Sequence, residues 1–188
     1  MGFEALHGRM DVALNMLCSC TVFMFLVTSA PISQFRGSGI RTDGSGGASK
    51  LACVTSWGLK NDCNNNHYDY RSTSITCARS RQLFQVAQAF YIIAVIVSFL
   101  GIKAKVALIV LGFLEVVVAL IPWVCMTAVW HNDYCGQSTV MINASSGKAN
   151  GVPYGSVLRT AFKMSAGYGM TVTAWCVQVV GLTLLLTM

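Results

Sequence analysis

Residues 53–63 read CVTSWGLKNDC, a stretch in which two cysteines frame a Trp-Gly-Leu step. From residue 51 to residue 59 the side chains alternate in character, and a period of two predicts a strand with Cys53 and Trp57 on one face. The turn-rich residues 60–66 are expected to reverse the chain, and a second short strand is expected over residues 73–77. The stretch therefore predicts a small β-sheet within a polar loop.

The composition of the whole chain indicates a membrane protein. Of its 188 residues, 54% are hydrophobic and only 11% are charged, and the mean hydropathy is +0.58. Soluble domains carry about 25% charged residues. A water-soluble fold of this size could not bury so much apolar surface, so lipid must be the solvent for part of the chain. The net charge of +6 does not indicate nucleic-acid binding, because the basic residues are scattered over loops without an aromatic platform.

Four apolar segments divide the chain, and each is long enough to cross a hydrocarbon core about 30 Å thick. They predict a single tetraspan domain over residues 1–188, a mostly α-helical four-helix bundle. The expected spans are residues 12–33, 83–102, 106–130 and 164–187, and the two long loops are residues 34–82 and 131–163. The first segment could instead be a signal peptide, but it exceeds the usual length of about 7–15 apolar residues and Pro31 follows its small residues directly.

The loops indicate which side of the membrane they occupy. Cys53, Cys63, Cys77 and Cys135 lie in polar segments, which fits two disulfides and an oxidising compartment. Asn143 begins an Asn-Ala-Ser glycosylation sequon in the second loop. The positive-inside rule opposes this orientation, since most Lys and Arg residues lie in the loops, but it weakens for loops approaching about 60 residues. We expect a multi-pass plasma-membrane protein with the long loops extracellular and the termini cytosolic.

With this layout, residues 53–63 resemble the signature of the amastins, the surface glycoproteins of kinetoplastid parasites. The matching positions are Cys53, Val54, Thr55, Trp57, Gly58, Lys60, Asp62 and Cys63. Ser56 departs from the pattern, because the family prefers Leu or Phe there. The resemblance implies a claudin-like fold with an extracellular, disulfide-stapled β-sheet. It also implies a surface protein that acts in contact with the host compartment, in membrane integrity, or in ion or proton traffic.

The four loop cysteines allow three connectivities, and the sequence alone does not choose among them. Hairpin geometry favours Cys53–Cys63, and Cys77–Cys135 then follows only by elimination. A bridge that closes so short a loop would contribute about 3 kcal/mol by chain entropy. The bridge is either a purely structural staple or a staple that also presents Trp57 and Lys60 as a binding edge.

Glu115 is an acidic residue in the third expected span, near mid-bilayer, where a charge costs a few kcal/mol. Gln178 in the fourth span has a matching depth, so the two could meet; Gln88 and Ser98 match less well. One interpretation is a protonated glutamate that is hydrogen-bonded inside the bundle. The alternative is a titrating group in an ion or proton pathway, although the spans contain no second ionisable residue for a relay.

Small residues mark two of the expected spans. Ser165, Gly169 and Thr173 recur every four residues in the fourth, and Gly112 and Ala119 lie in the third. Small side chains let helices approach closely. We expect them to pack within the bundle, with homo-oligomerisation as the alternative.

The sequence contains no arrangement typical of catalysis or metal binding. His67 and His131 lie near loop cysteines without zinc-ligand spacing, and there is no Ser-His-Asp set, phosphate loop or carboxylate pair. We therefore expect neither an enzyme nor a cofactor. The expected partner is the lipid bilayer, joined by a second copy of the chain or a host surface component.

Overall fold

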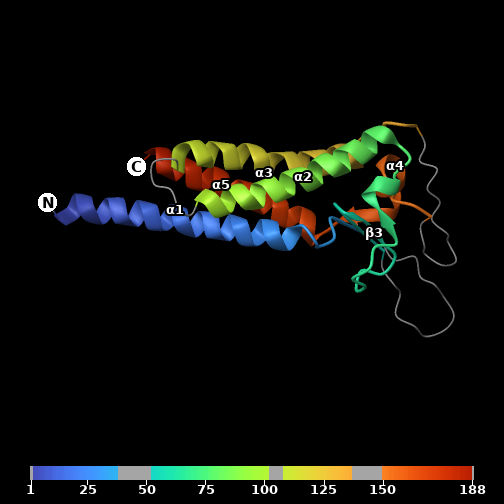
Figure 1. Cartoon of the computed structure of the whole chain (residues 1–188), viewed down its shortest axis with the longest axis horizontal. Coiled ribbons are helices and arrows are strands. Elements are labelled where there is room, and N and C mark those ends of the chain that lie inside the picture. Colours follow the sequence, from blue (N-terminus) through green and yellow to red (C-terminus); the bar gives the residue numbers. More distant parts are fainter. Residues whose placement is uncertain (1, 38–51, 102–107, 137–149, 188) are drawn as a thin grey trace.

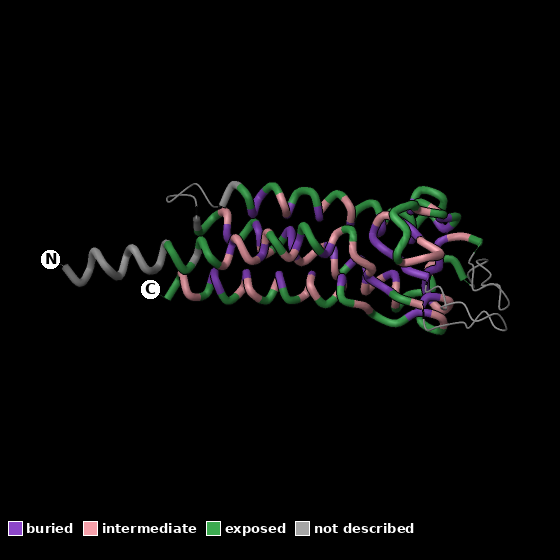
Figure 2. The backbone as a smooth tube through the Cα atoms, turned by 90° about the horizontal axis from the view of Figure 1, so that it is seen from below, coloured by how far each residue is buried: buried purple, intermediate pink, exposed green. Residues whose placement is uncertain are grey.

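The computed structural model describes residues 2–37, 52–101, 108–136 and 150–187. Long helices lie side by side as a bundle, and a layer of strands, loops and a short helix covers one end of it (Figures 1 and 2). Both ends of the chain lie at the opposite end of the bundle (Figure 1). The bundle helices are α1 (Gly2–Ser29), α2 (Ala78–Gly101), α3 (Leu108–His131) and α5 (Ala166–Thr187).

Three of these helices are long and apolar enough to cross a membrane. The candidate spans are Ala78–Phe99, Ile109–His131 and Ala166–Thr187, with mean hydropathies of 1.7, 2.4 and 1.7. Within the described residues, α1 contributes a shorter apolar stretch, Met16–Ser29. The chain is thus mostly helical with three candidate spans, and the fourth span stays a prediction.

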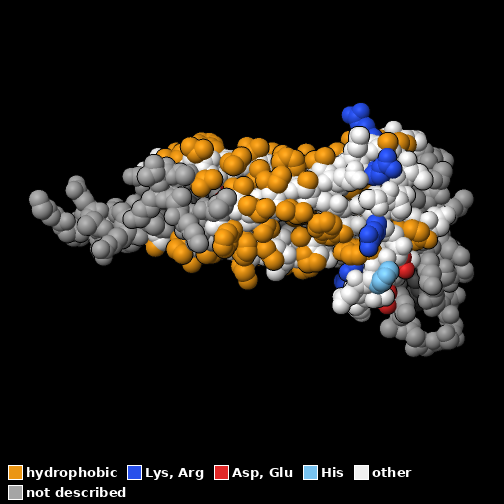
Figure 3. Space-filling view, in the orientation of Figure 1, with side chains coloured by type: hydrophobic (Ala, Val, Ile, Leu, Met, Phe, Trp, Pro, Cys, Tyr) orange, Lys and Arg blue, Asp and Glu red, His pale blue; other side chains and the backbone are white. Residues whose placement is uncertain are grey.

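Large apolar side chains cover much of the exterior of the bundle. α2 packs against α3, α5 packs against α1 and α3, and α1 also contacts α2. Large apolar side chains nevertheless point outward, and Val110 and Leu17 are 72% and 66% exposed. Figure 3 shows hydrophobic side chains over the helices, whereas Lys and Arg gather near the covered end. Such an exterior is suited to lipid rather than water. The apolar core of the bundle includes Val22, Leu26, Tyr91, Ala94, Val97, Val118 and Ala174.

Small residues lie on the buried face of α5, but they are not the ones that recur every four residues in the sequence. Gly169 and Thr173 point outward, and a Cβ at Gly169 would meet no atom within 4 Å, so the prediction that this stripe packs within the bundle is wrong. A helix repeats every 3.6 residues, so a strict spacing of four drifts away from the contact face. On α3 the expected approach is present, because a Cβ at Gly112 would lie 3.0 Å from Leu182 of α5. The buried residues of α5 are Gly167, Thr171, Ala174, Gln178, Gly181 and Leu182.

An antiparallel sheet of five short strands brings the two long loops together. Its strand order is β4-β3-β2-β1-β5, so β5 of the second loop lies at one edge, next to β1 of the first. In register, Phe35 of β1 pairs with Val54 on one side and with Met164 of β5 on the other. The strands are β1 (Phe35–Gly37), β2 (Cys53–Thr55), β3 (Gly58–Lys60), β4 (Tyr70–Arg71) and β5 (Phe162–Met164).

The strands differ from those expected in two places. Residues 51–59 do not form one strand: the chain turns at Ser56-Trp57, so that Thr55 pairs with Gly58 and Val54 with Leu59. Residues 73–77 do not form the second strand either, because β4 ends at Arg71 and the 3₁₀ helix η1 (Ser72–Ser74) follows it. The turn-rich residues 60–66 do lie where the chain reverses, between β3 and β4.

We call the sheet, η1 and the short helix α4 (Gly155–Ala161) the cap. The cap packs on the adjoining ends of α2 and α3. Phe35 stacks on Trp130 of α3 with ring centroids 5.0 Å apart. Buried side chains of the strands, of both loops and of the helices share a single apolar core, which fixes the cap on the bundle. That core includes Phe35, Val54, Leu59, Ile75, Phe84, Met126, Val129, Tyr154, Leu158 and Phe162.

Candidate functional site

The turn of the β2–β3 hairpin depends on two residues of the 53–63 stretch. Gly58 has a φ of +150°, and a Cβ there would collide with the backbone of Tyr70 in β4, so that only glycine fits. Thr55 Oγ1 accepts the backbone N–H of Trp57 at 3.1 Å and donates to the carbonyl of Gly58 at 3.3 Å. These contacts close the turn and explain why the stretch contains threonine and glycine at these positions.

The Cys53–Cys63 disulfide closes the hairpin from its open end. The two Cα atoms lie 5.3 Å apart, and the bridge joins the first residue of β2 to the loop that follows β3. In the ladder Cys53 pairs with Lys60, so the bridge crosses the hairpin close to its last paired residues. The bridge therefore holds the loop after β3 against β2.

The charged residues of the stretch make contacts within the same loop. Lys60 Nζ lies 4.7 Å from the centroid of the Tyr68 ring, and Asp62 Oδ1 accepts the N–H of Asn64 at 3.0 Å. A cation over an aromatic face and an aspartate at a turn both stabilise local structure. Lys60 and Asp62 thus shape the loop that the disulfide closes.

The hairpin turn rests on the bundle through α2. Gln88 Nε2 donates to the carbonyl of Ser56 at 2.7 Å and to Ser72 Oγ at 2.6 Å. The N–H of Ser72 donates in turn to the carbonyl of Trp57 at 2.9 Å. Trp57 itself is half-buried in this position. The turn, η1 and α2 are consequently held together, and Trp57 stays partly exposed.

The second disulfide joins the two loops where they leave the bundle. Cys77 directly precedes α2 and Cys135 follows α3, and their Cα atoms lie 5.9 Å apart. Beside the bridge, Arg79 lies over the ring of Tyr134 with its Cζ atom 5.4 Å from the centroid. The cap thus carries two disulfides that use all four cysteines of the polar segments.

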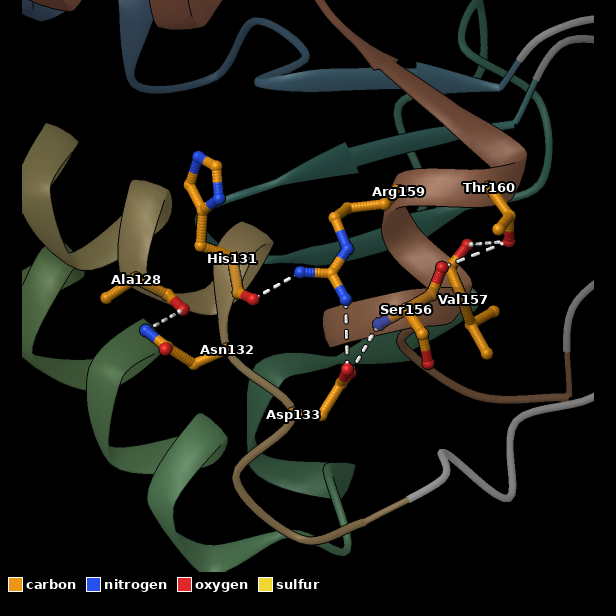
Figure 4. A network of polar contacts seen from close by, with 8 residues as sticks. All are labelled: Ala128, His131, Asn132, Asp133, Ser156, Val157, Arg159 and Thr160. Carbon is orange, nitrogen blue, oxygen red and sulfur yellow. Dashed lines mark hydrogen bonds and ion pairs between the residues drawn. The ribbon is translucent and has the colours of Figure 1, made fainter.

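A polar network that the sequence did not reveal ties the end of α3 to α4 (Figure 4). Asp133 accepts the backbone N–H of Ser156 and forms an ion pair with Arg159 at 2.9 Å. Arg159 also donates to the carbonyl of His131. The Ser156 N–H and the nearby guanidinium hold the pKa of Asp133 below its ordinary value of 3.8. A Cβ at Gly155, where φ is +59°, would collide with the same carboxylate. No local pattern marks partners so far apart in the chain.

The buried carboxyl group in the bundle has a partner other than the one expected. Glu115 is 2% exposed, and its carboxylate accepts a hydrogen bond from Ser98 of α2. Gln178 is also buried, but its Oε1 has no hydrogen-bond partner among the described residues. The antiparallel packing of α2 and α3 explains why Ser98 is the partner. Ser98 lies shortly before the connection between the two helices and Glu115 shortly after it, so both lie at a similar position along the bundle.

Two further expectations concern glycosylation and metals. Asn143 lies outside the described residues. Within them, no group of three His, Cys, Asp or Glu residues is close enough to hold a metal ion. The remaining cysteines are free thiols at Cys18, Cys20, Cys125 and Cys176.

Comparison with known proteins gives one result for nearly the whole chain. Residues 20–185 match the family described as "Amastin surface glycoprotein". No curated protein matches the chain. The match covers α2, α3, the described strands, nearly all of α5 and the last third of α1, so it includes both the bundle and the cap.

Proposed function

The chain belongs to the amastin family of surface glycoproteins, and from this premise we propose that it acts through the cap as a contact surface. The observation that carries the proposal is the joining of both loops into one layer. β5 of the second loop extends the sheet of the first, and the Cys77–Cys135 bridge links the two again. A layer held in this way is a rigid surface on a lipid-facing bundle, suited to contact or to sealing rather than to catalysis.

In this proposal α1 is the fourth span and the long loops are extracellular, so both termini are cytosolic. An apolar bundle with a disulfide-stapled antiparallel sheet at one end supports a claudin-like arrangement. The cap would then face the host compartment, or a second copy of the chain in the same membrane, and contribute to adhesion or to membrane integrity. It would need no cofactor.

The orientation is tested by enzymatic deglycosylation of the protein on intact cells. We expect a gel shift for the wild type that is absent in Asn143→Gln. Asn150→Gln is a matched control, because Asn150 lies in the same loop without a sequon, and it should retain the shift. An unshifted wild type together with loop thiols that react with a membrane-impermeant reagent only after the cells are permeabilised would contradict the extracellular cap.

A second candidate function is ion or proton permeation, and the buried Glu115 favours it. An acidic group inside a membrane bundle is often functional. Glu115 accepts a hydrogen bond from Ser98, so polar groups of α2 and α3 meet inside the bundle, and Gln178 is a buried polar residue of α5. Ala94, Val118 and Ala174 belong to the buried apolar cluster of the bundle and form an apolar layer about one helical turn closer to the cap than Ser98, Glu115 and Gln178. That layer favours the first proposal, because a pathway would have to cross it.

The two functions respond to different substitutions. Trp57→Ala should lower adhesion of proteoliposomes to host-cell membranes several-fold, whereas Glu115→Gln should leave adhesion unchanged. Permeation predicts the reverse pattern, with loss of proton flux in Glu115→Gln vesicles. Both variants must first be incorporated into the vesicles at wild-type levels. Normal adhesion in Trp57→Ala would contradict the contact surface.

A further inference from the structure

A cluster of polar side chains is enclosed where the hairpin turn meets the bundle. The hydroxyl groups of Tyr91 in α2 and Thr171 in α5 share a hydrogen bond of 2.7 Å. The side chains of Ser29, Gln34 and Ser56 lie close to the same tyrosine hydroxyl. All five residues are at most 1% exposed. The cluster therefore joins α1, the segment after it, the hairpin turn, α2 and α5 out of contact with solvent.

Two oxygen atoms in this cluster lack a partner. Gln34 Nε2 donates to the carbonyl of Ser29 at 3.0 Å, but Gln34 Oε1 has no hydrogen-bond partner among the described residues. Ser56 Oγ likewise has none within that part of the chain. Buried polar atoms in folded proteins are almost always hydrogen-bonded, and water supplies the bond where protein groups do not.

We propose that the cluster is a binding site for a water molecule that bridges Gln34 Oε1 and Ser56 Oγ. The water donates to the amide oxygen and bonds the serine hydroxyl, and Tyr91 Oη is in position to serve as a third partner. Buried waters make about three such bonds (range about 2–4). The bridge adds a side-chain link between the hairpin turn and the segment after α1, which the backbone N–H of Gln34 already joins to β2 through the carbonyl of Val54 at 2.8 Å.

The chemistry of the cluster selects water over a cation. Its five side chains are neutral and contain no carboxylate. A cation moved from water into a buried site without an opposite charge loses more hydration energy than a few neutral oxygen atoms return. A neutral molecule that both donates and accepts satisfies the two oxygen atoms without this cost.

The direct test is a high-resolution structure of the full chain in lipid. We expect one discrete density peak about 2.7–3.0 Å from both Gln34 Oε1 and Ser56 Oγ, and its loss in Ser56→Val. A crystal soaked in thallium should show no anomalous signal at this position. A direct Gln34–Ser56 hydrogen bond, an anomalous peak, or the absence of the density in the wild type would each overturn the proposal.

A double-mutant cycle tests the bridge in solution. Gln34→Met and Ser56→Ala should each lower the apparent Tm by about 2–4 °C, and the double variant should lower it by clearly less than the sum, because the first substitution already releases the water. The control pairs Gln34→Met with Ser80→Ala. Ser80 is also fully buried, and its Oγ has no hydrogen-bond partner in the part of the chain that the structure describes. It lies two turns before Gln88 on α2 and outside the cluster. That pair should be additive, and additivity in the Gln34–Ser56 pair would overturn the bridge.

Discussion

Most residues of the 53–63 stretch stabilise the β2–β3 hairpin. Gly58 fits a backbone position that excludes a Cβ, and Thr55 closes the turn with two hydrogen bonds. Cys53 and Cys63 hold its open end. Ser56, the position that departs from the family pattern, is fully buried in the polar cluster. A Leu or Phe there would place an apolar side chain against Tyr91, so the departure follows from this chain's own packing.

Gly58→Ala should destabilise the cap. The substitution forces a residue with a Cβ into a positive φ and against the backbone of Tyr70, which costs at least about 1–3 kcal/mol. The loss is expected as a lower thermal midpoint and as faster hydrogen exchange in β3 and β4. Gly169→Ala is the matched control, since its Cβ meets no atom within 4 Å and alanine favours a helix. Equal stability of the two variants would show that the hairpin tolerates a side chain at residue 58.

At the scale of the elements, the hairpin shows why the alternation of side chains over residues 51–59 wrongly predicted a single strand. Across a two-residue turn, paired residues share a face of the sheet, so an even-numbered residue before the turn lies on the same face as an odd-numbered residue after it. A pattern of period two therefore cannot continue through the turn. Val54 and Leu59 pair across the ladder and both enter the apolar core. Val54 and Leu59 lie at equal distances from Ser56-Trp57, and Gly58 follows directly. This arrangement in the sequence indicates a hairpin, whereas the prediction of one strand over 51–59 took only the alternation into account.

The connection between α3 and α4 should respond to acid. Because the pKa of Asp133 is lowered in the folded protein, its ion pair and hydrogen bond add stability above the ordinary pKa of 3.8. This contribution should disappear as the pH falls from 3.8 through the lower pKa of the folded state. The difference in Tm between the wild type and Asp133→Asn should therefore be constant at neutral pH and vanish in strong acid.

Asn132→Ala provides the control for this pH profile. The Asn132 side chain caps α3 through the carbonyl of Ala128 at 3.1 Å and does not titrate. Its Tm difference from the wild type should stay the same across the pH range. An Asp133→Asn difference that persists below the lowered pKa of the folded state would indicate a role for the side chain other than its charge.

At the scale of the whole molecule, the disulfide between the two loops is expected to contribute most to stability. Cys77 and Cys135 are separated by 58 residues in sequence, whereas Cys53 and Cys63 are separated by 10. Chain entropy predicts a larger contribution from the longer loop, about 4 kcal/mol against about 3 kcal/mol. The longer bridge also joins the ends of α2 and α3 that carry the cap, so its loss should extend beyond one hairpin.

Replacing both Cys77 and Cys135 with serine should lower stability more than the corresponding change at Cys53 and Cys63. Hydrogen exchange should then rise at the start of α2, the end of α3 and α4, whereas loss of the shorter bridge should affect β2 and β3 alone. Cys176→Ser, which removes an exposed free thiol, should match the wild type in both measurements. Similar exchange patterns for the two disulfide variants would contradict the division of roles.

The sequence by itself determined the properties that depend on composition and on neighbouring residues: the lipid-facing helices, the polar loops, the cysteine inventory and the motif that identifies the family. The tertiary structure alone decided which distant residues meet. Pairing of Phe35 with Met164, the bond between Ser98 and Glu115, and the ion pair of Asp133 and Arg159 all join separate segments. Hydrophobic periodicity records which face of an element is buried, but a partner across the bundle or the sheet is set by packing in three dimensions, which no local pattern contains.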